Sequence, residues 1–291
     1  MDAMMRIEQM LDTALQRGEV PGAPPRLAAA MRYAVFPAGH RIRPKLCLAV
    51  AAACGDDAPN LTDAAASAIE FLHCASLIHD DLPCFDDADL RRGKAAVHKE
   101  FGEPLAVLAG DALIVAAFEV LAEEARQHPD RLAPLTLIIA RSVGMPHGIA
   151  AGQAWESEES AVLIDYQRAK TGSLFAAATV AGATAAGAGD SAAWHRLGGC
   201  IGEAYQVADD IRDAAATPEE IGKPVGQDTA HDRPSAALEL GIGGAVKRLK
   251  ALVAEATDTI PDCPGRGMLE KLIMAEASRF LPKELARRIA A

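Results

Sequence analysis

Apolar residues in the first part of the chain recur at helical spacing. Met5, Leu11 and Leu15 predict an amphipathic helix over residues 4–17. Pro37 ends a second predicted helix and Pro83 ends a longer one near Asp81, because proline interrupts the hydrogen bonding of a helix. The residues after Pro83 are therefore expected in an irregular loop. The full set of predicted helices covers residues 4–17, 26–35, 44–54, 62–81, 104–127, 131–153, 160–170, 172–187, 191–213, 235–256 and 266–279.

The composition strengthens the helical prediction. Half of the residues are apolar but only 4% are aromatic, and runs of alanine such as "LFAAATVAGATAAGAG" recur. Alanine is the best helix former and fits strands poorly. The sequence has no Gly/Ser-rich linker, shift in composition or repeat of fixed period. We therefore expect one all-α domain over residues 1–291, with little or no sheet.

Charge and cysteine content narrow the possible partners. A formal net charge of -11 argues against a nucleic-acid or anionic-membrane surface. The six cysteines form no CxxC pair, which favours a reduced cytoplasmic protein without a zinc site or a disulfide framework. The apolar stretch 173–189 is rich in Ala, Gly and Thr, so we expect a tightly packed interior helix there and no integral membrane segment. The N-terminus lacks the basic-then-apolar order of a signal peptide.

Two clusters of aspartate stand out from this background. The first is "HDDLPCFDDADLRRG" at residues 79–93, and the second is "YQVADDIRD" at residues 205–213. An acidic cluster is commonly a solvated surface, but both of these end otherwise apolar helices. Neighbouring carboxylates repel unless positive charge lies among them. Oxygen-only ligands favour Mg²⁺ or Mn²⁺ over zinc or copper, and the spacing is not that of a calcium-binding EF-hand loop.

Basic residues near glycine-containing turns suggest capture of a diphosphate. The chain has no P-loop, GxGxxG, GxSxG or HExxH motif, so neither a nucleotide fold nor a nucleophile with a partnered base is indicated. His79 is a candidate general base or a hydrogen-bond partner of Asp80. The reaction indicated is one in which metal ions help a diphosphate leave and the substrate itself forms the new bond. The basic candidates are Arg41, Arg43, Arg91, Arg92, Lys170 and Lys223.

The motif "DDLPCFDDADLRRG", with "HKEFGEPLAVLAGDAL" after it, resembles the first aspartate-rich motif of the trans-isoprenyl diphosphate synthases. The motif "GEAYQVADDIRD" resembles their second, and the resemblance runs from about residue 33 to about residue 235. It implies an all-α isoprenoid-synthase bundle around a central cavity, and a homodimer. It also implies condensation of isopentenyl diphosphate with an allylic diphosphate, using about three Mg²⁺ ions per active site, with Mn²⁺ an expected substitute.

The resemblance also assigns expected roles to individual residues. The expected metal ligands are Asp80, Asp81, Asp86, Asp209, Asp210 and Asp213. The residues expected to hold the allylic diphosphate are Arg91, Lys170 and Lys223, and those expected to hold isopentenyl diphosphate are Arg43, His73 and Arg92. Thr171 and Gln206 match positions that line the reaction centre.

One departure from the family pattern concerns His40. The usual "GGKRxRP" reads "AGHRIRP" here, so His40 stands where a lysine normally binds isopentenyl diphosphate. Histidine is only partly charged near neutral pH. We therefore predict that isopentenyl diphosphate binds more weakly as the pH rises through roughly 6–7.5. A KM for this substrate that stays flat across that range, at saturating Mg²⁺, would contradict the prediction.

The length of the product is predicted from the helix that ends at Asp80. Ala75 and Ser76, the fifth and fourth residues before Asp80 in the resembling motif, are small, whereas farnesyl-making relatives carry a bulky aromatic nearby. The inserted "PC" at residues 83–84 resembles the bacterial geranylgeranyl type. Both features favour a C20 product, geranylgeranyl diphosphate. The C15 alternative, farnesyl diphosphate, requires another side chain to close the cavity; the candidates are Phe71, Phe85 and Phe118.

Two other functions are kept as alternatives. A class I terpene cyclase would need an NSE-type second motif, but the sequence has "DDIRD". A non-catalytic subunit that regulates a prenyl synthase would generally have lost an aspartate motif, and both are present. Magnesium-dependent turnover by the purified chain distinguishes these possibilities.

Overall fold

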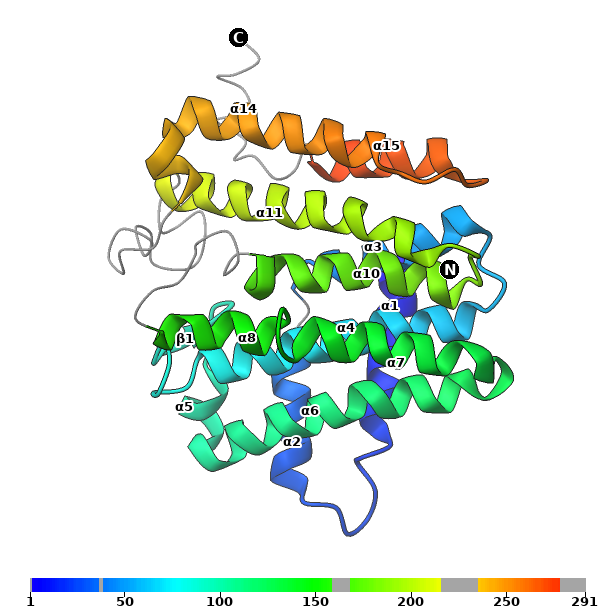
Figure 1. Ribbon diagram of the computed structural model, residues 1–291. Coiled ribbons are helices and arrows are strands. Elements are labelled where there is room, and N and C mark those ends of the chain that lie inside the picture. Colours follow the sequence, from blue (N-terminus) through cyan, green and yellow to red (C-terminus); the bar gives the residue numbers. More distant parts are fainter. Residues whose placement is uncertain (1, 37–38, 159–167, 216–234, 278–291) are drawn as a thin grey trace.

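The computed structural model describes residues 2–36, 39–158, 168–215 and 235–277, and nearly all of the regular secondary structure in these ranges is helical (Figure 1). The predicted all-α fold is therefore confirmed. The helices are α1 (Ala3–Gln16), α2 (Pro25–Val35), α3 (Ile42–Cys54), α4 (Pro59–Asp80), α5 (Val97–Phe101), α6 (Glu103–Glu124), α7 (Pro129–Val143), α8 (Ile149–Ala154), α10 (Ser173–Ala185), α11 (His195–Ala215), α14 (Ala236–Asp258) and α15 (Arg266–Ala277). Short 3₁₀ turns occupy Ala125–Gln127, Trp155–Ser157 and Ser191–Trp194, and a π-helical turn, η3, spans Arg168–Gly172.

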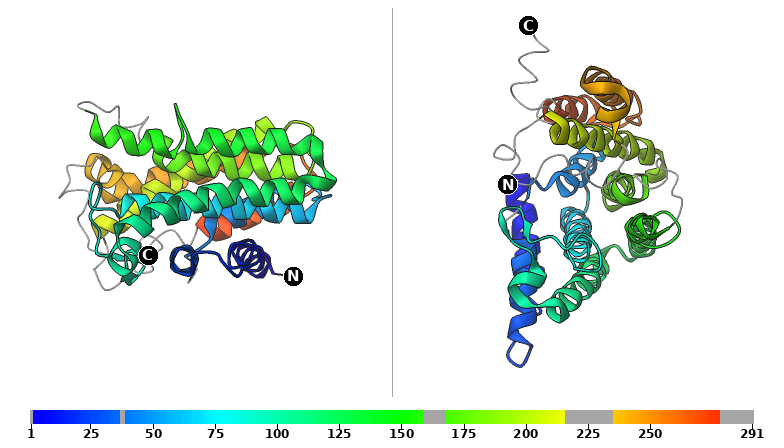
Figure 2. Two further views of the ribbon diagram at one scale, coloured as in Figure 1. Left: turned by 90° about the horizontal axis from the view of Figure 1, so that it is seen from below. Right: turned by 90° about the vertical axis from the view of Figure 1, so that its left-hand side faces the viewer.

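Most of the helices form stacked layers that run roughly along one direction, while α1 and α2 run across them (Figures 1 and 2). Helix α4 lies at the centre and packs against α3, α6 and α10, while α11 packs between α10 and α14. Nearly every side of α4 is buried, which explains why its sequence is apolar around its whole circumference. Helix α14 is kinked at Gly241, where φ is 67° and ψ is 163°. The loop that carries the first aspartate cluster and the start of α14 lie at the same end of the bundle (Figure 1).

Small residues allow the central helices to approach closely. Helix α10 is buried along nearly its whole length, as predicted for the stretch 173–189. A Cβ atom at Gly182 would lie 2.3 Å from the carbonyl oxygen of Cys47 in α3. By length and composition, α4 and residues Glu103–Gln127 could each span a membrane; 78% of the α4 window is buried inside the protein. For α4, burial in a protein core accounts for the apolar sequence.

The structure differs from the predicted helix over residues 131–153. The segment divides into α7 and α8, and Gly144 between them has an extended backbone, with φ -82° and ψ -164°. The Met145–Pro146 peptide bond is cis. Pro146 between two glycines cannot continue the helical hydrogen bonds, whereas Pro134 is accommodated inside α7. The break matters because it positions the short helix α8 beside the candidate site.

A two-stranded hairpin is the second feature that was not predicted. Strand β1 (Leu90–Arg91) pairs with β2 (Lys94–Ala95) in an antiparallel register. The two turn residues, Arg92 and Gly93, have φ values of 53° and 76°. Two consecutive residues with positive φ are typical of the tight turns that match the twist of a hairpin.

Candidate active site

The first aspartate cluster begins where α4 ends. Asp80 is the last residue of α4 and Asp81 caps it, and both are buried. The loop then turns back over the helix end, because the Asp86 N–H donates to the carbonyl oxygen of Asp80 at 3.0 Å. Asp86 itself is exposed. The prediction that Pro83 ends the helix and places the rest of the cluster in a loop is confirmed.

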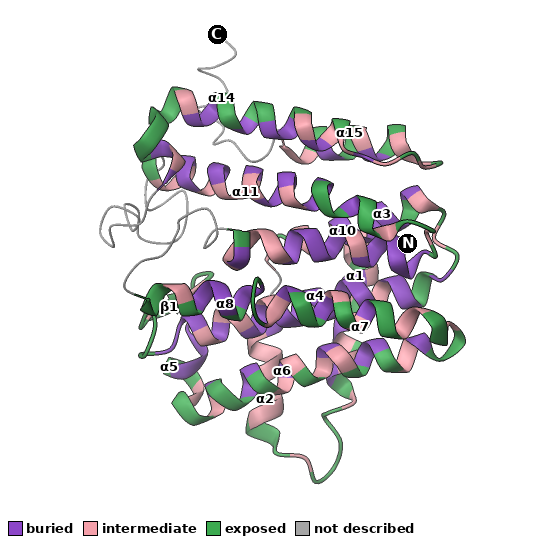
Figure 3. Cartoon of the chain, in the orientation of Figure 1, coloured by how far each residue is buried: buried purple, intermediate pink, exposed green. Residues whose placement is uncertain are grey.

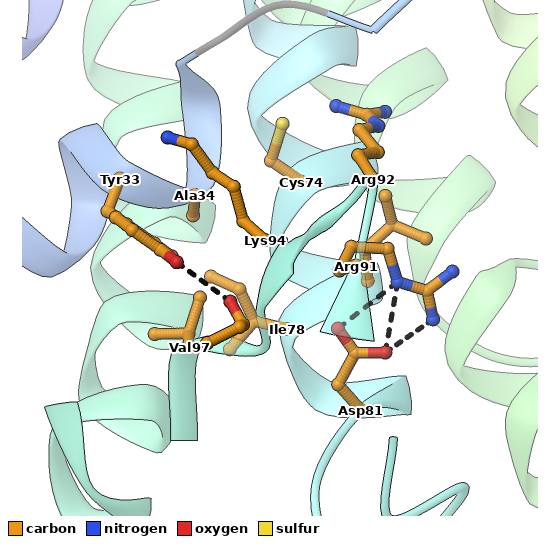
Figure 4. Close-up of a pocket in the computed structure, with 11 residues that line it drawn as sticks. Tyr33, Ala34, Cys74, Ile78, Asp81, Arg91, Arg92, Lys94 and Val97 are labelled. Carbon is orange, nitrogen blue, oxygen red and sulfur yellow. Dashed lines mark hydrogen bonds and ion pairs between the residues drawn. The ribbon is translucent and has the colours of Figure 1, made fainter. Parts of the chain in front are cut away.

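The hairpin returns the chain to the buried carboxylate of Asp81. The Arg91 Nε donates to the two Asp81 oxygens at 3.0 and 3.1 Å, and its Nη2 donates to Oδ1 (Figure 4). Burial raises the pKa of the Asp81 carboxyl, and the Arg91 guanidinium opposes that rise. On the other side of the hairpin, the Tyr33 hydroxyl donates to the Ala95 carbonyl at 2.9 Å and so fixes the hairpin to α2.

A small cavity of about 40 Å³ lies between α2, α4 and the hairpin (Figure 4). Its lining includes Asp81, Arg91, Arg92, Lys94 and Cys74. The volume suits about one or two water molecules and excludes a diphosphate. The cavity therefore accompanies the packing of the hairpin on α2 and α4, and a substrate diphosphate would bind outside it.

Asp80 makes contacts with a different part of the chain. Its Oδ1 accepts a hydrogen bond from Gln153 Nε2 in α8 at 2.8 Å and lies 3.4 Å from Lys170 Nζ in η3. Lys170 also pairs with Glu156 at 2.6 Å. Gln153 and Glu156 were missed by the sequence analysis. The only signal for Gln153 was a polar residue in the small, apolar stretch "IAAGQA".

The turn η3 is held between α8 and α11 by close backbone contact. A Cβ atom at Gly152 in α8 would lie 2.5 Å from the Lys170 nitrogen, and one at Gly202 in α11 would lie 3.0 Å from Gly172 Cα. Only glycine allows approaches this close. The π-helical form of η3 is also typical of functional sites.

The second aspartate cluster lies on α11. Asp210 is buried and accepts hydrogen bonds from Gln206 Nε2 at 2.9 Å and from the Ala236 N–H at the start of α14 at 2.8 Å. Burial raises the pKa of Asp210, although both hydrogen bonds favour the ionised form. Asp209 and Asp213 are half-buried, and Asp209 lies 3.8 Å from Arg212.

Polar contacts join the two aspartate clusters through η3. Thr171 Oγ1 donates to Gln206 Oε1 at 3.0 Å, while the preceding Lys170 contacts Asp80. Gln206 in turn donates to Asp210. The structure therefore brings together five residues that the sequence analysis singled out from positions 130 residues apart in the chain.

A separate group of basic residues lies beside this polar path. Arg43 Nη1 in α3 and Arg92 Nη2 in the hairpin turn each lie 3.5 Å from His73 Nε2 in α4. Arg43 is placed over the Phe175 and Tyr205 rings, at 4.5 and 5.9 Å from their centroids. The guanidinium of Arg92 also lies close to Gly39, where a Cβ atom would be 2.6 Å from Arg92 Cζ.

The charges of this group are arranged for an anion. Burial, together with Arg43 and Arg92, lowers the pKa of His73 well below its usual value, so the imidazole is neutral at pH 7. Burial also lowers the pKa of Arg43, and Arg92 adds to this effect. The buried Nε of Arg43 has no hydrogen-bond partner in the part of the chain that the structure describes. Two crowded guanidinium groups repel each other, so a negatively charged ligand between them would stabilise both.

The remaining candidates are placed as follows. His40 is exposed, Ala75 is buried, and Ser76 donates through Oγ to the His73 carbonyl at 2.8 Å. His79 faces α6, with Nε2 3.9 Å from Asp111 Oδ1. Lys223 lies outside the described residues.

The donor set of the two clusters fits Mg²⁺ better than a softer metal. The aspartates supply only oxygen ligands, as Mg²⁺ prefers. Within the described ranges, no three Asp, Glu, His or Cys side chains converge on one point. Mg²⁺ usually retains several waters and takes further oxygens from a substrate phosphate, so one or two carboxylates from each cluster are sufficient.

Comparisons with known proteins show which family the chain belongs to. A sequence model of the polyprenyl synthetase family matches residues 24–263. The chain is 54% identical to a geranylgeranyl diphosphate synthase of Cereibacter sphaeroides over 284 residues, covering 98% of each protein. It is 51% identical to the Rhodobacter capsulatus protein of the same name, covering 95% of each. The fold resembles a Helicobacter pylori geranyltransferase complexed with magnesium and isoprenyl diphosphate, with a TM-score of 0.78, 28% identity, and 96% and 98% coverage.

Proposed function

The chain belongs to the polyprenyl synthetase family, and we propose that it condenses isopentenyl diphosphate with allylic diphosphates to make geranylgeranyl diphosphate. Two relatives at 54% and 51% identity, which carry that name, support the C20 product. One observation supports this activity most strongly: the two aspartate clusters lie beside a group of basic residues. Lys170, Thr171 and Gln206 join the two aspartate clusters. The basic group consists of Arg43, His73 and Arg92. We call the two aspartate clusters the acidic half-site and the group of Arg43, His73 and Arg92 the basic half-site. Together they suit a reaction with two diphosphate substrates.

The acidic half-site would hold the allylic diphosphate and Mg²⁺. The ligands that we propose are Asp80, Asp81, Asp86, Asp209, Asp210 and Asp213. When bound, Mg²⁺ would neutralise the diphosphate and make it a better leaving group. The ammonium group of Lys170 lies beside the Asp80 carboxylate and would pair directly with the same phosphates. Arg91 and Lys223 are further candidates for binding these phosphates. The contact of Gln153 with Asp80 would fix the orientation of that carboxylate.

The basic half-site would hold isopentenyl diphosphate. Arg43 and Arg92 would each donate to its phosphates, with the neutral imidazole of His73 between them. His40 is exposed at the start of the same segment and would take the place of the usual lysine. Stacking on Phe175 and Tyr205 limits the guanidinium of Arg43 to one orientation, which lowers the entropic cost of binding.

The reaction follows from the placement of the two substrates. The allylic C–O bond breaks and its electron pair leaves with the diphosphate. The double bond of isopentenyl diphosphate then attacks the allylic carbon, and a proton is lost to the departing diphosphate. Thr171 and Gln206 lie between the two aspartate clusters, where the oxygen dipole of each can stabilise the positive charge of the allylic carbon.

We also propose that the chain forms a homodimer through α6. This helix is strongly apolar, yet only 39% of an 18-residue apolar window within Glu103–Gln127 is buried in one chain. Val107, Leu108 and Val115 are exposed, as is Leu137 of the neighbouring α7. Exposed and partly exposed positions recur along α6 in Figure 3. An exposed apolar face of this kind marks an interaction surface. A cytoplasmic location remains a prediction from the sequence.

The activity is tested by turnover of the purified chain. We expect product from isopentenyl and farnesyl diphosphates only when Mg²⁺ is present, with Mn²⁺ as a partial substitute. Asp80→Asn and Asp209→Asn should each lower kcat/KM by at least about 100-fold. The matched control Asp262→Asn changes an exposed aspartate before α15 and should retain activity. Metal-independent turnover, or full activity in Asp80→Asn, would contradict the proposed site.

A further inference from the structure

Arg41 carries a buried positive charge that the proposed reaction does not use. Its side chain is fully buried at the start of α3, two residues before Arg43. Nε donates to Glu8 of α1 at 2.8 Å, Nη1 donates to Glu70 of α4 at 2.6 Å, and Nη2 donates to the Val35 carbonyl of α2 at 2.8 Å. The guanidinium of Arg41 therefore links the start of α3 to three other helices, α1, α2 and α4.

The charge of Arg41 is stable in this position. Burial lowers the pKa of an arginine, but the hydrogen bond to Glu8 and the charge of Glu70 more than offset that effect, and the pKa of Arg41 is raised. Glu70 is itself only 2% exposed, so Arg41 is the charge that makes its burial tolerable. The planar fork of arginine suits the three acceptors, whereas the single ammonium of lysine does not.

The backbone of Arg41 is also in an unusual conformation. Its φ of 50° and ψ of 39° are left-handed, which is unfavourable for a residue with a Cβ atom. Such a conformation persists only where the surroundings fix it, and it is commonly found at functional sites. At Arg41 the fixing contacts are those to Glu8, Glu70 and Val35.

The start of α3 and helix α4 also make the contact that belongs to the basic half-site. Glu70 and His73 are three residues apart on α4 and so share one face of it. Arg41 contacts Glu70, and Arg43 contacts His73. The contact between Arg41 and Glu70 therefore lies next to the one between Arg43 and His73, along the same face of α4.

We propose that Arg41, held by Glu8 and Glu70, is a positioning residue for the half-site that binds isopentenyl diphosphate. The inference rests on the proposed function, because it deepens the role given to Arg43. Arg41 does not touch the substrate. It fixes the left-handed turn from which α3 begins, and so keeps the guanidinium of Arg43 beside His73 and Arg92.

The test is the KM for each substrate in variants of this contact. Arg41→Lys should raise the KM for isopentenyl diphosphate about tenfold, with kcat and the KM for the allylic diphosphate within about twofold of wild type. Glu8→Gln keeps Arg41 and an acceptor oxygen but removes one charge, and should raise the same KM about threefold. Because the Glu8 side chain is 28% exposed, this milder variant is expected to fold even where Arg41→Lys does not.

Arg32→Lys is the matched control. Arg32 also pairs with two carboxylates, Asp12 and Glu19, each at 2.7 Å. Arg32 and Arg41 both lie over the Phe36 ring, at 5.6 and 5.8 Å from its centroid. It makes none of the contacts at the start of α3, so both KM values should stay at wild type.

Each outcome decides between the claims. Wild-type chain that forms no product would overturn the proposed function itself. Active wild type, with Arg41→Lys and Glu8→Gln folded and unchanged in the KM for isopentenyl diphosphate, would overturn only the role of Arg41. A parallel rise in both KM values, or an equal rise in Arg32→Lys, would also overturn it, because a general loss of stability would then explain the data.

Discussion

Gly152→Ala tests whether contact between α8 and η3 positions the reacting groups. The new Cβ atom would lie 2.5 Å from the Lys170 nitrogen and 2.6 Å from its Cα, both backbone atoms that cannot rotate away. To reach an ordinary contact of 3.4 Å, α8 and η3 must separate by about 0.9 Å along the shortest of these directions. That shift moves Lys170 relative to Gln153, and therefore relative to the Asp80 carboxylate that both contact.

The expected loss of activity is large compared with the loss of stability. A displacement of about 1 Å in a positioned catalytic group costs up to about 100-fold in rate, so we expect kcat/KM to fall about 30- to 100-fold. The clash should destabilise the fold by about 1–3 kcal/mol, of which the better helix propensity of alanine offsets up to about 1 kcal/mol. The assay is steady-state turnover with farnesyl and isopentenyl diphosphates, together with urea unfolding of the same preparation.

Gly199→Ala is the matched control for this substitution. Gly199 lies inside α11, and among the described residues no atom apart from its chain neighbours and the nearby backbone of α11 lies within 4 Å of a Cβ built there. Alanine at this position should stabilise the fold by about 0.4–1 kcal/mol and leave kcat/KM unchanged. A Gly152→Ala variant with kcat/KM within twofold of wild type would refute the argument that this contact positions Lys170.

Three further predictions address product length, pH and assembly. Ala75→Phe should shift the main product from C20 to C15, because the new ring would occupy buried space below Asp80; an unchanged C20 product in the sized alcohols would refute this. Because the pKa of His73 is lowered in the fold, the unfolded state binds the proton first as the pH falls below 6.5. The free energy of unfolding, measured in urea titrations, should therefore decrease by about 1 kcal/mol between pH 7.5 and 5.5. In His73→Gln this residue cannot titrate, so the decrease should be smaller by that amount. The same pH dependence of stability in both proteins would contradict this. We expect the wild type to be a dimer in light scattering and Val115→Glu on α6 to be a monomer; a dimeric variant would argue for another interface.

The sequence was a good guide to the helices and a poor guide to their interruptions. Alanine-rich apolar segments identify α4 and α10 because burial on all sides needs small or apolar residues throughout. Proline is ambiguous: Pro134 is accommodated inside α7, whereas Pro146 lies between two helices, and only the surrounding glycines and packing distinguish them. The hairpin was missed because Arg92 adopts positive φ without being glycine or asparagine.

The sequence indicated which charged residues belong to the candidate site, but it did not indicate which residues contact one another there. The aspartates and basic residues were evident because their charges are unusual beside apolar helices. Gln153 and the pairing of Arg41 with Glu8 and Glu70 were not, since those contacts depend on how distant helices approach. Helical periodicity gives the face of a helix on which a residue lies, but it does not give the partner helix.

The most direct test of the central claim is the chain length of the product made by the wild-type protein. The purified chain is incubated with Mg²⁺, labelled isopentenyl diphosphate and, separately, dimethylallyl, geranyl or farnesyl diphosphate, and the dephosphorylated products are sized. Our account predicts a C20 alcohol from all three allylic substrates and none without Mg²⁺. A product that stops at C15 would contradict the C20 assignment, and the absence of any product would contradict the proposed activity.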